Sequence, residues 1–410
     1  MVIYPDTWIK YTFDQFFKLI SNNTLSRDKL SETGEVGNIH YGDVLIKYGE
    51  IITDKDSIPR IKEPIEINDN NYLQKNDVIL ADTAEDETVG KVSQVGDVSI
   101  PLVGGLHTVV CRPQKETADG YLGYYMNSRY YHDQLLPYIT GIKVSSVSKK
   151  SLNETHIVIP CDTEEQKAIV DIFSDIDQHL TNLTELIDKK RNLREGALED
   201  LLSGTTILKG FAGKRKVYSI NEITKTVITG GTPSTRREDF YGGDIPWLSS
   251  TEIHQKRICR PTTYITELGL QNSSAQIAPG RSVLIALAGQ GKTRGTAAYL
   301  TEPMALNQSL AALVANEKCC PEFLFYAMDR MYLPLRELSS GDGGRGGLNK
   351  KLIKGFSIEI PVDVEEQIAI AEVLTDMDEE INDLNSEKEK ILQIRVGALD
   401  DLLTGRIRLM

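Results

Sequence analysis

The stretch Ile157-Val-Ile-Pro-Cys-Asp-Thr-Glu-Glu-Gln166 returns 201 residues later as Ile358-Glu-Ile-Pro-Val-Asp-Val-Glu-Glu-Gln367. The same offset relates Gly196-Ala-Leu-Glu-Asp-Leu-Leu-Ser-Gly204 to Gly397-Ala-Leu-Asp-Asp-Leu-Leu-Thr-Gly405, and no gap is needed. Of the 52 positions aligned in this way, 22 are identical, which chance does not produce. The chain is therefore an internal duplication, and such a repeat constrains the architecture before any single motif does.

Each copy of the repeat predicts the end of a strand followed by one long helix. Asp162-x-x-Glu165 and Asp363-x-x-Glu366 are helix N-cap signatures. Apolar residues then recur at three-four spacing, which indicates a coiled-coil seam. The residues expected in this seam are Ile169, Ile176, Leu183, Ile187, Ile370, Met377, Leu384 and Ile391, and the same runs include Leu193, Val373 and Ile394.

Gly204 and Gly405 stand where C-terminal caps belong. About 40 helical residues correspond to roughly 60 Å. The alternative interpretation is a pair of ordinary core helices, but their length and acidity favour a protruding coiled coil. If the seams pair, the second helix runs antiparallel to the first and brings the C-terminus near the N-terminus. The expected molecule is a dumbbell with a pseudo-twofold axis across a two-helix rod.

The segments outside the helices repeat more weakly and predict two compact α/β domains. We divide the chain into a first head at 1–155, a first helix at 156–208, a second head at 209–356 and a second helix at 357–410. Matching landmarks in the two heads are Lys75–Ala81 with Pro279–Ala286, Gly120–Met126 with Pro321–Met328, Ser148–Leu152 with Asn349–Ile353, and Tyr41 with Tyr241. A helix is expected at about 120–135 and again at about 321–337. One scaffold therefore carries two different recognition surfaces.

The charge of the chain is unevenly distributed. The formal net charge is −13. Counted by segment, the first head is near −6, the first helix near −6, the second head near +8 and the second helix near −9. Segment charges, rather than their average, bear on partners. The basic second head suits phosphate, and the acidic helices suit protein partners or are simply solvated faces.

Several classes of protein are disfavoured by composition. The five cysteines form no C-x-x-C pair, which argues against a disulfide framework and a zinc site and fits a reducing cytoplasm. No apolar run approaches the roughly 18 residues that span a membrane, and no secretory signal is expected. The six histidines are scattered, and neither a metal cluster nor a motif for amino-group methylation is found. No catalytic centre is therefore predicted in the chain.

One loop imitates a phosphate-binding motif. Ala286-Leu-Ala-Gly-Gln-Gly-Lys-Thr293 fits a relaxed phosphate-loop pattern, but the residues that follow it are β-like and end at Pro303. A true phosphate loop needs a helix there. The same glycine-flexed loop offers donors suited to base edges and phosphates. An exposed, solvated turn is the equally weighted alternative.

These features together resemble the specificity subunit of type I restriction–modification enzymes, over the whole chain. The resemblance rests on the head–helix–head–helix order and on the two repeated motifs that bracket each helix. Ile228-Thr-Gly-Gly-Thr-Pro-Ser234, Asp244-Ile-Pro-Trp-Leu248, Gly289-Gln-Gly-Lys-Thr-Arg-Gly295 and Asn307-Gln308 are similar to a family recognition domain. The first head lacks the Thr-Gly-Gly-Thr-Pro opening, although its loop Ala81–Lys91 is similar to a family variant.

The resemblance implies a function without catalysis. Such a subunit is cytoplasmic and reads a bipartite, asymmetric site on double-stranded DNA, one half-site per head. Its helical rod docks two methyltransferase subunits, which methylate adenine N6, and motor-nuclease subunits join through the complex. No cofactor is expected in this chain, because S-adenosylmethionine, ATP and Mg belong to the partner subunits. The rival hypotheses are a coiled-coil scaffold that binds no DNA and an enzyme that binds nucleotide at residues 286–293.

Residues in polar, glycine-rich loops are the predicted DNA contacts. In the basic second head they are Arg236, Arg237, Gln290, Lys292, Thr293, Arg294 and Arg345, and in the first head Lys91 and Lys143. Acidic side chains of the first head, such as Asp86 or Glu87, are possible acceptors for a cytosine amino group, although a solvated acidic loop is the simpler interpretation of each.

Overall fold

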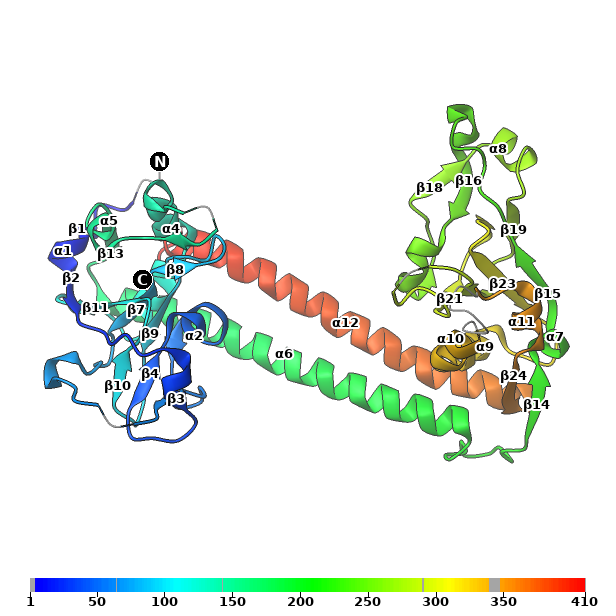
Figure 1. Cartoon of the computed structure of the whole chain (residues 1–410), viewed down its shortest axis with the longest axis horizontal. Helices are drawn as coiled ribbons and strands as arrows, with labels where there is room; N and C mark the ends of the chain where they lie inside the picture. The colour runs from blue at the N-terminus through cyan, green and yellow to red at the C-terminus, as the bar shows by residue number, and fades with distance from the viewer. Residues whose placement is uncertain (1–3, 64, 142, 290, 339–346, 410) are drawn as a thin grey trace. The chain divides into compact units, whose positions relative to one another are not determined.

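A computed structural model describes residues 4–63, 65–141, 143–289, 291–338 and 347–409 (Figure 1). By its contacts the chain divides into two units. The first unit comprises residues up to Thr184 together with those from Ser386 onward, and the second comprises Glu185–Asn385. Each unit thus holds one head and the adjoining halves of two long helices, α6 (Thr163–Ser203) and α12 (Val364–Leu402).

Each head is built around a five-stranded sheet whose strand order is the same in both units. The edge pairs β5·β9 and β17·β21 are parallel, and the remaining pairs are antiparallel. In order across the sheets, the strands are β2 (Phe17–Ile20), β11 (Thr108–Pro113), β7 (Val78–Ala81), β9 (Val92–Val95) and β5 (Ile51–Ile52), and β15 (Thr224–Thr229), β23 (Leu310–Ala315), β20 (Ser282–Ala286), β21 (Ala297–Leu300) and β17 (Arg257–Ile258).

A second, four-stranded sheet completes each head and shares only part of its order between the units. A parallel pair flanked by an antiparallel strand occurs in both, as β10–β4–β6 and as β22–β16–β18. The strands are β10 (Leu102–Gly104), β4 (Gly37–Ile39), β6 (Arg60–Ile61) and β3 (Leu30–Ser31), and β18 (Thr263–Ile265), β16 (Tyr241–Leu248), β22 (Met304–Leu306) and β19 (Gln276–Ala278).

A two-stranded ribbon closes each head where the chain enters and leaves it. β1 (Trp8–Thr12) pairs with β13 (His156–Pro160), and β14 (Arg215–Ser219) pairs with β24 (Ser357–Pro361), both antiparallel. Short helices complete the heads: α1 (Phe13–Phe16), α2 (Tyr41–Ile46), α3 (Tyr121–Asn127), α4 (Arg129–Leu135) and α5 (Lys149–Leu152) in the first, and α7 (Ile220–Ile223), α8 (Glu267–Gln271), α9 (Pro321–Arg330), α10 (Tyr332–Leu338) and α11 (Lys350–Gly355) in the second.

The central strands β7 and β20 are apolar, apart from Ser282 at the start of β20, because both of their faces are covered. Val78 and Leu80 of β7 join one core with α3 and α6, while Ile79 and Ala81 face a second core with the four-stranded sheet. β20 behaves identically, since Val283 and Ile285 lie in one cluster and Leu284 and Ala286 in another. Side chains that alternate between two buried faces produce such continuous apolar strands.

The structure confirms three of the four matched landmarks. The strands β7 and β20, the helices α3 and α9, and the helices α5 and α11 occupy equivalent places in the two heads. The match of Tyr41 with Tyr241 is wrong, because Tyr41 opens helix α2 whereas Tyr241 opens strand β16. Each expected single helix is also divided in two, since Ser128 is extended between α3 and α4 and Met331 separates α9 from α10.

The two long helices run antiparallel beside each other within each unit (Figure 1). In the second unit, Lys190 binds Glu380 at 2.5 Å and Arg194 binds Asp378 at 2.9 Å. Residue numbers therefore increase along α6 in the direction in which they decrease along α12. Asp162 and Asp363 accept bonds from the backbone N–H groups of Glu164 and Glu365 as expected N-caps. Gly204 and Gly405 have positive φ values of 79° and 69°, as C-terminal caps require.

Most of the expected seam residues are covered. Ile169, Leu183, Ile187 and Ile370 are buried, and Ile176, Met377, Leu384 and Ile391 are half-buried. Leu193, Val373 and Ile394 are exposed, so their place in the seam was predicted wrongly. For Leu193 and Ile394 the reason is the next residue, because Arg194 and Arg395 turn towards the neighbouring helix and bind Asp378 and Asp177 there.

Candidate nucleic-acid interface

A hairpin loop of equal length leaves the central strand of each head. Residues 82–91 connect β7 to β9 and residues 287–296 connect β20 to β21. The two loops close in the same way, because Gly90 N–H donates to the Ala81 carbonyl and Gly295 N–H donates to the Ala286 carbonyl, both at 2.9 Å. Both glycines have positive φ, which favours glycine at the closing position. The structure therefore identifies corresponding loops that share little sequence.

The tips of the two loops carry opposite charge. Glu85, Asp86 and Glu87 form the tip in the first head, and all three are exposed. Asp86 accepts bonds from the Thr88 hydroxyl and backbone N–H, and these hold the pKa of its carboxyl below the ordinary value. In the same register Glu85–Glu87 correspond to Gln290-Gly-Lys292, which carries the cation Lys292, and Arg294 follows two residues later. One backbone frame thus presents anions in one head and cations in the other.

The second loop is held by its neighbours while the Lys292 side chain stays exposed. The Lys292 carbonyl accepts bonds from the hydroxyls of Thr296 and Tyr332, at 2.8 and 3.2 Å. Thr293 Oγ1 lies 3.2 Å from His254 Nε2, and Arg294 is half-buried. The element that follows the loop is strand β21, so the helix N-terminus on which a phosphate loop depends is not at this position.

The family-like motifs of the second head converge on one turn. A Cβ at Gly230 would lie 1.7 Å from the Leu306 carbonyl oxygen, so only glycine allows this close approach. Trp247 Nε1 donates to the Gly231 carbonyl at 3.1 Å, and the Thr232 hydroxyl donates to Gln308 at 2.7 Å. The three separate stretches Ile228–Ser234, Asp244–Leu248 and Asn307-Gln308 are therefore one packed structure.

The remaining predicted contacts differ in their exposure and in whether their charge is already paired. Arg236 is exposed, while Arg237 forms a two-pronged ion pair with Asp239 at 2.7 and 2.6 Å and lies over the Phe240 ring. This pair raises the pKa of the Arg237 guanidinium. Lys143 is exposed just before strand β12 (Ser145–Ser146), which pairs with β8 (Thr83–Ala84) in the acidic loop of the first head. Gln290 and Arg345 lie outside the described residues.

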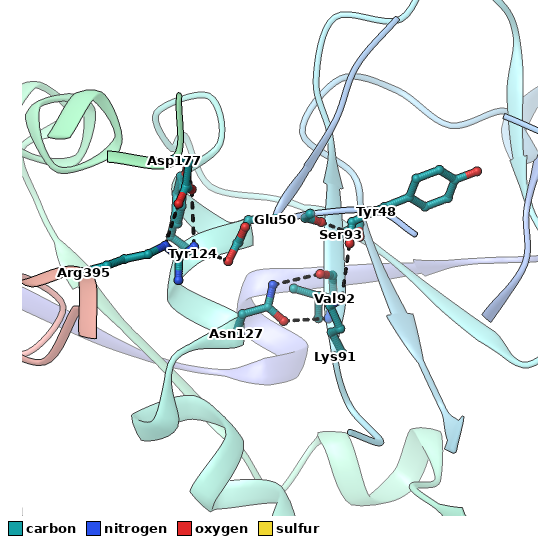
Figure 2. A network of polar contacts seen from close by, with 10 residues as sticks. Tyr48, Glu50, Lys91, Val92, Ser93, Tyr124, Asn127, Asp177 and Arg395 are labelled. Atoms are coloured by element: carbon teal, nitrogen blue, oxygen red, sulfur yellow. Dashed lines mark hydrogen bonds and ion pairs between the residues drawn. The ribbon is translucent and has the colours of Figure 1, made fainter. Parts of the chain in front are cut away.

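Lys91 points inward rather than towards solvent (Figure 2). Its ammonium group donates to the carbonyls of Leu45 and Tyr48, at 3.0 and 3.2 Å. Burial lowers the pKa of this lysine. By position Lys91 corresponds to Thr296 at the end of the second loop, and its bonds tie the end of the first loop to helix α2. The charge of Lys91 is therefore already satisfied by backbone carbonyls.

A polar junction between head and helices was missed by the sequence analysis. Arg395 of α12 binds Asp177 of α6 at 2.6 Å and Glu50 of the first head at 2.6 Å, and the Tyr124 hydroxyl donates to Asp177 at 2.9 Å (Figure 2). Burial opposes the charge of Arg395, but its two carboxylate partners outweigh burial and raise its pKa above the ordinary value.

The same junction recurs in the second unit. Arg194 of α6 binds Asp378 of α12 at 2.9 Å, and the Tyr326 hydroxyl donates to Asp378 at 2.8 Å. Where the first unit has the ion pair between Arg395 and Glu50, the second unit has Arg257 of the head, which donates to the Tyr326 hydroxyl at 3.0 Å. A signal was available, because an aspartate followed 17 residues later by an arginine is identical in both copies of the repeat.

The repeated glutamine also has a structural role. Gln166 accepts a bond from Ala118 N–H at 2.9 Å and donates to the Pro160 carbonyl at 2.8 Å. Gln367 makes the equivalent bonds, to Cys320 N–H and the Pro361 carbonyl, both at 2.8 Å. Each glutamine thus ties the first turn of a long helix to the strand before it and to the segment that opens α3 or α9.

Comparison with known proteins agrees with this architecture. The family model described as the type I restriction modification DNA specificity domain matches residues 5–190 and 213–393, one match for each copy of the repeat. The chain belongs to this family. It is a specificity subunit, a non-catalytic component that recognises target DNA in type I restriction–modification systems.

Relatives of the specificity subunit cover most of its length. A protein of Methanocaldococcus jannaschii, assigned as the type I restriction enzyme MjaX specificity subunit, is 25% identical over 81% of this chain and 78% of its own. The EcoR124I/EcoR124II specificity subunit of Escherichia coli is 24% identical over 62% of this chain and 61% of its own.

Solved structures show the same fold. The crystal structure of a type I S subunit from M. genitalium matches with a TM-score of 0.62 at 17% identity, covering 96% of each chain. A chain from structural work on complex assembly and conformational transition of the type I R-M system matches with a TM-score of 0.60 at 17% identity, covering 99% of this chain and 100% of its own.

The described residues contain neither a candidate metal site nor a candidate membrane-spanning helix. Among the described residues, no group of three or more His, Cys, Asp or Glu side chains could hold a metal ion. Within the same residues, no helix is long and apolar enough to cross a membrane.

Proposed function

We propose that this specificity subunit reads a bipartite, asymmetric DNA site, one half-site per head. The observation that carries the proposal is the pair of equivalent hairpin loops with opposite charge at their tips. A common scaffold gives both heads a similar approach to the duplex, and different loop chemistry selects different bases. Cations of the second loop suit phosphates and guanine acceptors, while carboxylates of the first suit the cytosine amino group.

In this proposal the two heads bind DNA in different ways because their net charges differ. Lys292, Arg236 and Arg294 supply phosphate attraction in the basic second head. The first head, near −6, binds largely through base contacts, with Lys143 beside its loop and further positive charge supplied by partner subunits. Arg237, paired with Asp239, and Lys91, tied to backbone carbonyls, are predicted contacts whose charges are already engaged.

The two long helices are the proposed platform for two methyltransferase subunits. Their acidic faces are repelled by DNA phosphate and are free for protein contacts. S-adenosylmethionine would bind to the methyltransferase subunits, and ATP and Mg to motor-nuclease subunits that join the complex. The assembled complex would methylate adenine N6 and cleave unmodified DNA.

Methylation-sensitive sequencing of a host with and without this chain tests the proposal. We expect a single interrupted motif with two unlike halves to lose adenine methylation when the chain is removed. The same purified chain with its cognate methyltransferase should bind oligonucleotides that contain both halves more tightly than those with either half alone. A coiled-coil scaffold predicts no change in methylation and no DNA binding, and either result would overturn the proposal.

A further inference from the structure

A three-residue turn lies against the base of the hairpin loop in each head. Residues 105–107 join β10 to β11, and residues 307–309 join β22 to β23. In both heads the first residue of the hairpin loop donates its backbone N–H to the carbonyl of the last residue of the turn, at 3.1 Å in the first head and 2.8 Å in the second. The two turns are therefore equivalent, and each is tied to the loop beside it.

The side chains of the two turns differ. The second head carries Asn307-Gln308 there, one of its family-like motifs, and Gln308 accepts a bond from the Thr232 hydroxyl. In the first head the turn is Gly105-Leu-His107. Glycine and leucine have no polar side chain, so His107 alone gives this turn a side chain that can hydrogen-bond to a base.

The backbone of His107 has an unusual conformation. Its φ is 56°, in the left-handed region that residues other than glycine seldom adopt. The turn is held in place because Gly105 N–H donates to the Ile39 carbonyl at 2.8 Å and Tyr41 N–H donates to the Leu106 carbonyl at 3.3 Å. Glycine would adopt this conformation at a lower cost, so backbone stability does not explain the histidine.

The imidazole of His107 is held through one of its two nitrogens. The Thr83 hydroxyl donates its single hydrogen to the Asp82 carboxylate at 2.8 Å. His107 Nδ1 lies 3.4 Å from the same hydroxyl oxygen and 3.5 Å from the carboxylate. Both oxygens act as acceptors in these contacts, so Nδ1 carries the hydrogen. The neutral ring then has its lone pair on Nε2, which can only accept a hydrogen bond.

The accepting nitrogen is available while the ring is fixed. The His107 side chain is 47% exposed, and within the described parts of the chain Nε2 has no hydrogen-bond partner. The Tyr41 ring packs edge-to-face with the imidazole, with centroids 5.3 Å apart, and His40 packs on the other side of Tyr41 at 4.6 Å. A fixed acceptor therefore lies beside the acidic hairpin loop.

We propose that His107 reads the exocyclic amino group of an adenine or a cytosine in the first half-site, with Nε2 as the acceptor. In the major groove only these two bases present an amino donor, whereas guanine and thymine present acceptors. Thr83 is a positioning residue, because it acts through the hydrogen on Nδ1. The inference rests on the proposed function and adds the residue and the base edge that it recognises.

The test uses the full-length chain with its cognate methyltransferase and the half-site found by methylation sequencing. Each adenine or cytosine of the first half-site is replaced in turn by purine or 2-pyrimidinone, which lack the amino group. Fluorescence anisotropy measures the Kd of each duplex. We expect the wild-type chain to lose about tenfold in affinity at the position that His107 reads.

His107→Gly removes the acceptor and suits the positive φ, so the variant should fold with a similar melting temperature. It should bind the unmodified site about tenfold more weakly than the wild type. At one position it should be indifferent to the missing amino group, because the same contact cannot be lost twice. Its sensitivity at every other position should equal that of the wild type.

Two further variants test the positioning role and the specificity of the effect. Thr83→Val removes the hydroxyl that orients the ring and should reduce discrimination at the His107 position alone, and Thr83→Ser should restore it. His156→Ala, which removes a half-buried histidine from the ribbon of the same head, is the control and should leave every position unchanged. Analogues in the second half-site should affect all variants equally.

The possible results separate this inference from the proposed function. If the wild-type chain does not distinguish its half-sites from unrelated DNA, the proposed function fails. If it does and His107→Gly keeps the wild-type sensitivity at every position, His107 reads no base. If His107→Gly instead becomes indifferent to 7-deazaguanine at a guanine, the imidazole donates rather than accepts, and the assigned tautomer is wrong.

Discussion

Paired side chains fix the ends of the long helices at the scale of single residues. In each unit an arginine on one helix binds an aspartate on the other, and a tyrosine of the head donates to the same aspartate. Removing one partner of a sheltered charge pair leaves the other charge uncompensated. The two units differ in one respect, since Arg395 keeps Glu50 as a second carboxylate.

Asp378→Asn should therefore destabilise the second unit more than Asp177→Asn destabilises the first. Arg194 loses its carboxylate partner in the first case, at an expected cost of about 1–3 kcal/mol, whereas Arg395 retains Glu50 in the second. The free energy of unfolding from urea titration checks this order. Asp376→Asn, an exposed neutralisation two residues away, is the control, and equal losses in all three variants would contradict the interpretation.

Lys292 and Arg236 give a second test at the residue scale. If they bind phosphate, Lys292→Ala and Arg236→Ala should weaken binding to every DNA sequence and lower the salt slope by about one each. If one of them reads a base, its loss should cost about 1–3 kcal/mol and relax one position of the site. Fluorescence anisotropy across a salt series measures both quantities, and Lys318→Ala, elsewhere on the second head, is the control. Unchanged affinity and slope in both variants would exclude them from the interface.

At the scale of elements, the long helices were predictable because their periodicity and caps repeat. The caps at Asp162, Asp363, Gly204 and Gly405 all have the expected geometry. Exposure of Leu193 and Ile394 was not predictable from spacing, because a following arginine decides which way that turn faces. The equivalence of the two hairpin loops was not predictable from the sequence either. Backbone hydrogen bonds define this equivalence, whereas the side chains at the loop tips differ in charge.

A charged residue in the seam should separate the helices. Leu183 is 5% exposed, so Leu183→Asp places a carboxylate in an apolar contact and should cost several kcal/mol. Leu384→Asp tests the other helix. Leu186→Asp, three residues further along α6 and 39% exposed, is the control and should have a small effect. Thermal unfolding followed by circular dichroism would show the difference, and a Leu183→Asp chain as stable as Leu186→Asp would refute the seam.

At the scale of the whole molecule, the duplication predicted the architecture, and the shared order of the five-stranded sheets extends it into the heads. The weak similarity of the head sequences gave three correct landmarks and one wrong one. Matching Tyr41 to Tyr241 failed because a short motif cannot distinguish a helix start from a strand start when the surrounding loops differ in length. The target bases could not be predicted from the sequence, because the two loop tips carry different side chains and follow no repeating pattern.

A fragment of residues 1–208 should reproduce the duplication by dimerising. Its exposed seam resembles the missing one, so an antiparallel homodimer can replace the internal pair. Both heads would then be copies of the first, and the fragment with its cognate methyltransferase should methylate an interrupted palindrome containing one parental half-site. Sequencing of modified adenines checks this, with the full-length chain as control. Methylation of the parental asymmetric motif by the fragment would refute the prediction.

The ribbons that close the two heads make each head a replaceable cassette. Trp8 lies opposite Pro160 in the first ribbon, and Arg215 lies opposite Pro361 in the second. The strands by which the chain enters and leaves a head are therefore neighbours. Helix α6 begins at Thr163, shortly after Pro160, and helix α12 begins at Val364, shortly after Pro361. Recombination at these two points exchanges an entire head while the helices, their junctions and their glycines stay intact. Two crossovers, one at each strand of a ribbon, would therefore replace one head and leave the rest of the chain unchanged.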